Sequence, residues 1–163
     1  MSRERHLLVV GAHAADFVGR AAGAIAVATS QGAKATVIAL SYGEKGEAGD
    51  LWKEPGQTVE NVKRIRHEQA EKAANALGAE FICFDLGDYP LAVGAEALER
   101  LAETIRRLAP YAILTHTEKD PFNPDHPVAS QVVQQARQLA SGAGVASAFD
   151  IIAFIDHHPE KVG

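Results

Sequence analysis

The segment VVGAHAADFVGRAAGAIA, residues 9–26, contains the change of pattern that decides the fold. A continuous apolar run ends at Gly11, and a longer run rich in alanine follows His13 and Asp16. The first run is typical of a buried strand, and the second is typical of a helix that packs on a sheet. The short connection between them places an imidazole and a carboxylate together at the point where the strand ends.

The same alternation of strand and helix continues along the 163 residues. Strands are predicted at residues 6–11, 35–41, 80–84, 111–115 and 150–155. Helices are predicted at residues 17–31, 59–77, 95–108 and 128–139. This order predicts an α/β fold, a Rossmann-like three-layer sandwich in which helices cover both faces of a mostly parallel sheet. The length suits a single α/β domain over residues 1–163.

Composition narrows the class of protein. Hydrophobic residues make up 47% and charged residues 23% of the chain, which is ordinary for a globular domain. No stretch reaches the roughly 18 apolar residues of a membrane span, and no signal peptide is recognised, so we expect no membrane partner. The net charge of −5 argues against a nucleic-acid surface. Cys83 is the single cysteine, which excludes an internal disulfide and agrees with a cytoplasmic location.

Polar clusters follow each predicted strand. Because ligands of parallel α/β sheets bind beyond the carboxyl ends of the strands, these clusters are expected to converge on one edge. They are His13 and Asp16, Glu44 and Glu47, Asp85 and Asp88, the stretch from His116 to His126, and finally His157 and His158.

His13 and Asp16 are suited to bind a divalent metal such as Zn²⁺. The alternative is a histidine bonded to the backbone and an aspartate that caps the following helix. The segment THTEKDPFNPDHPVA, residues 115–129, could supply a third ligand in His126, and three ligands with an open position are typical of catalytic zinc. Asp125 could orient a neighbouring histidine or could cap the helix ahead of Pro127.

The AHxxD opening, the GExGE loop and the PDH segment resemble the PIG-L/LmbE-like family of zinc-dependent deacetylases, over about residues 7–139. The resemblance implies Zn²⁺ held by His13, Asp16 and His126. In that family the opening usually reads AHPDDE, and its first aspartate is the general base. Here Ala15 stands at the base position, and Asn123 replaces the first histidine of the family's HxDH segment. Loss of a general base costs roughly 10²- to 10⁴-fold in rate, so we expect a poor amide hydrolase.

The runs HAADFVGRAAGAIA, GEKGEAGDLW and DPFNPDHP resemble one subgroup of that family, the 4-oxalomesaconate hydratases. The resemblance implies a hydro-lyase of gallate and protocatechuate catabolism. It would add water to the C=C bond of an anionic tricarboxylate, 4-oxalomesaconate, to give 4-carboxy-4-hydroxy-2-oxoadipate. It also implies a homo-oligomer. The alternative is a zinc-dependent N-deacetylase of an acetylated sugar or related amide. A metal-free binding protein on a degenerate scaffold is a third hypothesis, and the retained ligand set argues against it.

Proton transfer requires further residues. Glu47 is the first candidate for the general base, because its glycine-flanked loop can bring a carboxylate close to the metal, and Glu44 is the alternative. Without the resemblance, both would be assigned to a solvated charged loop. His157, in FIDHHPE, aligns with a histidine of the subgroup and is the second acid/base candidate. Its alternative is a surface histidine near the chain end.

Three residues are candidates for substrate binding. Arg20 lies four residues after Asp16 and could bind a carboxylate, or could form a salt bridge with Asp16. Asn123 could orient substrate oxygens, or could be a turn residue before Pro124. Glu44 completes this set. On the long helix, most of Arg64, Arg66 and His67 are expected to face solvent in pairs with Glu60, Glu68 and Glu71. Family members usually run longer, so the domain is expected to lack its C-terminal part or to have segments omitted after Leu139.

Overall fold

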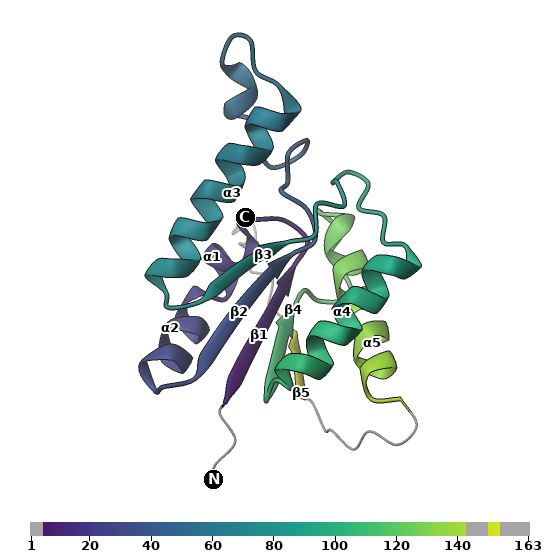
Figure 1. Ribbon diagram of the computed structural model, residues 1–163. Coiled ribbons are helices and arrows are strands. Elements are labelled where there is room, and N and C mark those ends of the chain that lie inside the picture. Colours follow the sequence, from purple (N-terminus) through teal and green to yellow (C-terminus); the bar gives the residue numbers. More distant parts are fainter. Residues whose placement is uncertain (1–4, 143–149, 154–163) are drawn as a thin grey trace, which may run out of the picture.

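The computed structural model describes residues 5–142 and 150–153. Within them, five parallel strands form one sheet in the order β3-β2-β1-β4-β5 (Figure 1). In the central position, Val9 of β1 pairs with Val37 on one side and Leu114 on the other. The predicted parallel α/β sheet is therefore confirmed. The strands are β1 (His6–Gly11), β2 (Lys34–Ala39), β3 (Glu80–Cys83), β4 (Ala112–Thr115) and β5 (Asp150–Ala153).

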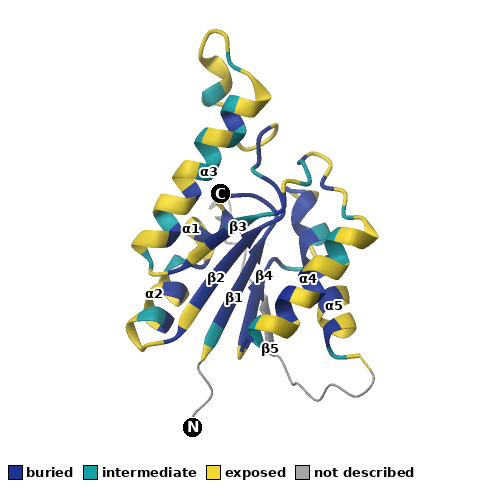
Figure 2. Cartoon of the chain, viewed as in Figure 1, coloured by how far each residue is buried: buried dark blue, intermediate teal, exposed yellow. Residues whose placement is uncertain are grey.

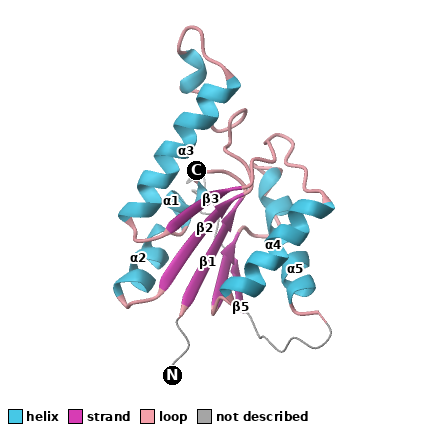
Figure 3. Ribbon diagram, viewed as in Figure 1, coloured by secondary structure: helices cyan, strands magenta, loops and turns pink. Residues whose placement is uncertain are grey.

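Helices cover both faces of this sheet, which gives the predicted three layers (Figure 3). Successive residues of a strand point to opposite faces, so Leu7 and Val9 enter one core and Leu8 and Val10 enter the other. The strands β1, β2 and β4 are buried almost throughout, and the outer helix surfaces are exposed (Figure 2). One face packs against α1 (Asp16–Arg20), α2 (Ala22–Ser30) and α3 (Val59–Ala76), and the other against α4 (Ala95–Leu108) and α5 (Asp125–Ala140).

The structure differs from the prediction at two helices. The helix expected at residues 17–31 is divided at Ala21, whose φ is −123°, and Gly19 and Gly23 lower the helix propensity on both sides of the break. The helix expected from residue 128 begins at Asp125. Pro127 is tolerated in this first turn because the N–H that it lacks would have no partner there. His126 therefore lies on a helix rather than in a loop.

One short element lies outside the core layers. A short 3-10 helix, η1 (Leu51–Lys53), interrupts the long connection between β2 and α3. Among the described residues, no helix combines the length and the apolar character needed to cross a bilayer.

The central strand should carry much of the fold's stability. Leu8 is fully buried, so we expect Leu8→Ala to lower the free energy of unfolding by about 2–5 kcal/mol through lost burial and the cavity that remains. Val27, which is 57% exposed, provides the matched control, since Val27→Ala removes methyl groups that stay in solvent. Urea unfolding followed by circular dichroism measures both variants, and equal midpoints would contradict the assignment of this core.

Candidate metal centre

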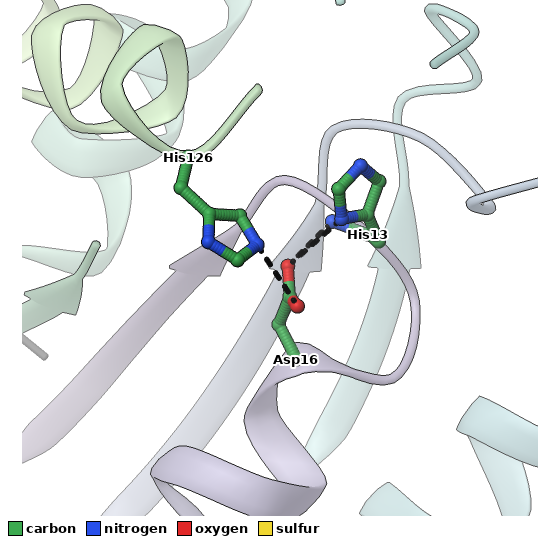
Figure 4. Close-up of side chains that lie close together, drawn as sticks. All are labelled: His13, Asp16 and His126. Carbon is green, nitrogen blue, oxygen red and sulfur yellow. Dashed lines mark hydrogen bonds and ion pairs between the residues drawn. The ribbon is translucent and has the colours of Figure 1, made fainter. Parts of the chain in front are cut away.

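Two of the three predicted ligands come from the turn between β1 and α1. Asp16 is the first residue of α1, and its Oδ2 accepts a hydrogen bond from the backbone N–H of His13 at 2.7 Å. His126 reaches the same point from the first turn of α5, and Figure 4 shows the three side chains directed toward one another. One ligand atom from each lies within 4.8 Å of the others. All three residues are buried.

The imidazoles are oriented by carboxylates on their far sides. His13 Nε2 lies 3.0 Å from Asp125 Oδ2, and His126 Nδ1 lies 2.7 Å from Asp120 Oδ2. The opposite nitrogens, His13 Nδ1 and His126 Nε2, each lie 3.5 Å from an oxygen of Asp16. Buried His13 Nδ1 has no hydrogen-bond partner among the described residues. This arrangement, with one nitrogen on a carboxylate and the other directed to a common point, suits a metal-binding histidine.

The orienting role predicted for Asp125 is present, but it acts on a distant histidine. Asp125 holds His13, which is 112 positions away in the chain, rather than its neighbour His126. Asp120 performs that role for His126. The sequence analysis assigned no role to Asp120. Its position in the same loop as the candidate ligand His126 could have indicated that it orients this histidine.

The carboxylates around the centre change the pKa values of its histidines. Burial lowers the pKa of His13, but the hydrogen bond and charge of Asp16, with the carboxylate of Asp125, outweigh it and raise the pKa to about 9. The pKa of His126 is also raised, because Asp16 and Asp120 outweigh its burial. The pKa of Asp16 lies well below its usual range, since hydrogen bonds to the surrounding histidines outweigh its burial. The buried carboxylate of Asp16 thus raises the pKa of both histidines that face it.

His116 is a member of this cluster that sequence reasoning left without a role. It is fully buried at the end of β4, and its Nε2 lies 3.0 Å from Asp16 Oδ2. Its ring stacks on that of His126, with 3.9 Å between centroids and 9° between planes. On another side, Arg20 Nη1 lies 3.2 Å from Asp16 Oδ1, so the salt bridge considered as an alternative is present.

Glu47 lies beside the centre, as expected of a candidate base. Its Oε1 is 3.7 Å from His13 Nδ1 and accepts hydrogen bonds from Asn123 Nδ2 and the Tyr89 hydroxyl, both at 3.2 Å. Gly43 permits this approach: its φ is +71°, and a Cβ there would lie 2.8 Å from Glu47 Cβ. Burial and the charge of Glu47 raise the pKa of Tyr89 to about 12, so its hydroxyl remains a donor. The sequence analysis did not identify Tyr89 as a candidate site residue.

Glu44 does not join the other candidates. Its side chain is buried, and its Oε1 lies 3.8 Å from Lys63 Nζ, which in turn lies 2.6 Å from Asp85 Oδ1. Burial, with the nearby Asp88, raises the pKa of Glu44. The Trp52 indole donates to the carbonyl of Glu44 at 2.7 Å, which ties the loop to η1. His157, the remaining candidate, lies outside the described residues.

Pockets adjoin the site on the α3 side. A small one is lined by Ala14, Ala15 and Val18 of the turn and by Arg66, Gln69 and Ala70 of α3. A second, of about 370 Å³, shares Arg66 and Gln69 and extends along residues 47–51. Arg66 belongs to the group of which most were expected to face solvent. It is half-buried, because its Nε donates to the Tyr42 carbonyl at 3.2 Å.

Comparison of the sequence with known proteins gives two informative relatives. The chain is 43% identical over 164 residues to the 4-oxalmesaconate hydratase of Pseudomonas putida KT2440, covering 97% of this chain and 64% of that protein. It thus spans less than two thirds of that relative. It is also 26% identical to a probable N-acetyl-alpha-D-glucosaminyl L-malate deacetylase 2 of Bacillus anthracis, covering 100% of this chain and 72% of that one.

Solved structures agree with the fold. GalB, the 4-carboxy-2-hydroxymuconate hydratase from P. putida KT2440, superposes with a TM-score of 0.88 at 43% identity, covering 96% of this chain and 68% of that one. The N,N'-diacetylchitobiose deacetylase from Pyrococcus horikoshii shares the fold, with a TM-score of 0.78 at 17% identity and coverage of 94% and 61%. Residues 8–137 match the family profile described as PIG-L, GlcNAc-PI de-N-acetylase. Since that match spans most of the sequence, this chain belongs to the PIG-L family.

Proposed function

We propose that this chain is a zinc-dependent hydratase that adds water to the C=C bond of 4-oxalomesaconate, giving 4-carboxy-4-hydroxy-2-oxoadipate in gallate and protocatechuate catabolism. One observation carries the proposal: Ala15 has no proton acceptor, while Glu47 lies 3.7 Å from the metal-facing nitrogen of His13. The 43% identity to a hydratase supports it. The names of the hydratase relative and of GalB denote keto and enol forms of one tricarboxylate skeleton.

The residues present fit a zinc ion. His13 Nδ1, Asp16 and His126 Nε2 form the nitrogen and oxygen donor set that zinc accepts, and Asp125 and Asp120 fix the two rings. Bound there, zinc would stabilise negative charge on a substrate oxygen as a Lewis acid, or would acidify water.

Hydration places a hydroxyl on one alkene carbon and a proton on the other. In our proposal, the Glu47 carboxylate removes a proton from the water that adds to the alkene. Asn123 and Tyr89 hold that carboxylate in place. His157 remains our predicted donor of the proton that reaches carbon. Negative charge develops on an oxygen conjugated to the alkene, which a cationic neighbour stabilises.

The substrate's carboxylates require positive or polar partners. Arg20 remains our candidate to bind one of them, and Arg66 is added because it lines both pockets beside Glu47. Because one N–H of Asn123 Nδ2 donates to Glu47, only the second N–H of this group can orient a substrate oxygen. Glu44, which pairs with Lys63, is better assigned to support of the loop than to contact with substrate.

N-deacetylation is the second candidate, favoured by the family profile and by the B. anthracis relative. Ala15 argues against it, because the family's base position lacks a carboxylate. Cytoplasmic location and homo-oligomeric assembly remain predictions of the same proposal.

The activity is tested by incubating the zinc-loaded protein with 4-oxalomesaconate and following the loss of its conjugated absorbance. We expect turnover, and we expect Glu47→Ala to lower kcat roughly 10²- to 10⁴-fold while it retains zinc. Glu54→Gln, an exposed glutamate of the same connection, is the control and should keep the wild-type rate. If the absorbance stays unchanged and acetate is released from acetylated sugars, the proposed hydratase activity is wrong and the chain is a deacetylase.

The ligand set is tested by metal content. His13→Ala and His126→Ala each remove one of three ligands, so we expect both variants to lose zinc and activity together. His6→Ala is the matched histidine control, because His6 begins β1 at the opposite end of the strand and bonds Thr36. Elemental analysis after exhaustive dialysis gives zinc per chain. Wild-type stoichiometry in either ligand variant would remove that residue from the centre.

Zinc binding should release protons. The pKa of metal-free His13 is about 9, so at pH 7 its imidazole is protonated and must lose that proton before its Nδ1 can bind a cation. The apparent affinity for zinc should therefore rise as the pH increases from 7 to 9, and about one or two protons should leave at pH 7. Calorimetry in buffers of different ionisation enthalpy measures this number. Binding without proton release at pH 7 would show that His13 is neutral there.

A further inference from the structure

Tyr89 contacts the candidate base, a candidate ligand and the carboxylate that orients that ligand. Its hydroxyl donates to Glu47 Oε1 at 3.2 Å. Its ring is stacked on that of His13, with 5.6 Å between centroids and 8° between planes. Its backbone N–H donates to Asp125 Oδ2 at 3.0 Å, the same oxygen that lies 3.0 Å from His13 Nε2.

The backbone of Tyr89 is held in an uncommon conformation. Its φ is +41°, in the left-handed region that residues with a side chain rarely occupy. Asp125 fixes this segment, because its two oxygens accept the N–H groups of Tyr89 and Leu91 at 3.0 Å and 2.8 Å. A strained residue maintained in this way beside a candidate site is a reason to look for a role in that site.

The loop that carries Glu47 is fastened to the same segment. The fully buried carboxylate of Asp88 accepts the backbone N–H groups of Lys45 and Gly46 at 2.9 Å and 2.6 Å. The Tyr89 ring lies directly against Gly46, where an added Cβ would come within 2.0 Å of Tyr89 Cε2. A larger residue at Gly46 would force the Tyr89 ring or the loop to shift. The ring therefore packs directly on the loop just before Glu47.

The direction of the Glu47 carboxylate is set by two donors. Tyr89 from the β3–α4 connection and Asn123 from the β4–α5 connection both donate to Oε1, each at 3.2 Å. Two bonds from different loops to the same oxygen fix the position of Oε1 beside His13. This is the property required of a base, since proton transfer depends on reach and orientation.

We propose that Tyr89 is a positioning residue for hydration: its hydroxyl orients the Glu47 carboxylate, and its ring holds His13 parallel to it, so that base and ligand keep a fixed separation. This inference rests on the proposed function, in which Glu47 is the base.

The test is Tyr89→Phe in the full zinc-loaded chain, alone and combined with Glu47→Ala. Phenylalanine keeps the ring against His13 and Gly46 and removes only the hydroxyl. We expect kcat to fall about 10- to 100-fold, with zinc content unchanged and KM within about twofold of wild type. Because Tyr89 acts through Glu47, adding Tyr89→Phe to Glu47→Ala should lower kcat no further. Tyr111→Phe is the control, since Tyr111 is equally exposed (37%) and precedes β4.

A crystal structure of Tyr89→Phe supplies a readout that does not depend on turnover, and the Glu47 carboxylate should rotate away from His13. Equal losses of kcat with and without Glu47, or an unchanged kcat in an active wild-type background, would overturn the inference and leave the proposed function intact. A wild-type protein that fails to hydrate the tricarboxylate would overturn the proposed function. In that case, an unmoved Glu47 in the variant crystal would separately overturn the positioning role.

Discussion

The site is organised around one buried negative charge, the carboxylate of Asp16. Only 5% of this residue is exposed, and an ionised carboxylate removed from water is costly unless charged or polar partners replace the lost solvent. The replacement comes from the backbone of His13, the guanidinium of Arg20, and the imidazole of His116. These groups come from the β1–α1 turn, α1 and the end of β4, so the charge at Asp16 connects the ends of two neighbouring strands to α1.

A line of alternating acids and imidazoles extends outward from Asp16: Asp125, His13, Asp16, His126 and Asp120 follow one another. Each histidine lies between two carboxylates, which accounts for the raised pKa of both. A divalent cation at the centre would take over the positive charge that the protons supply, so the same side chains serve both forms. The short segment from Asp120 to His126 contributes one ligand, both orienting carboxylates and Asn123, which explains how few residues build so much of the site.

The sequence was sufficient to predict that the loop with His13 and Asp16 would meet the loop that ends at His126, because alternating strands and helices bring every loop after a strand to the same edge. The resemblance to the family then selected His126 as the third ligand. Glu47 became a candidate only with the resemblance to the family, since its loop alone would have been assigned to a solvated charged surface. The partner of Asp125, the inward position of His116 and the direction of Glu44 were not predictable, since each depends on a loop backbone rather than on a periodic pattern. Tyr89 shows why: its φ is positive although it is not glycine, and the local propensity of tyrosine does not favour that conformation.

Ala15 bears on the choice of substrate as well as on the choice of base. It lines a pocket together with Arg66 and Gln69, beside a second pocket that Glu47 shares with the same two residues. A carboxylate at residue 15 would place negative charge in that space and would oppose both an anionic substrate and the charge of Glu47. With alanine there, the turn adds no negative charge beside Arg66, and the carboxylates that line the second pocket are those of Glu47 and Asp50. In the proposed function, a base at Glu47 with alanine at residue 15 therefore leaves less negative charge beside a substrate that carries three negative charges.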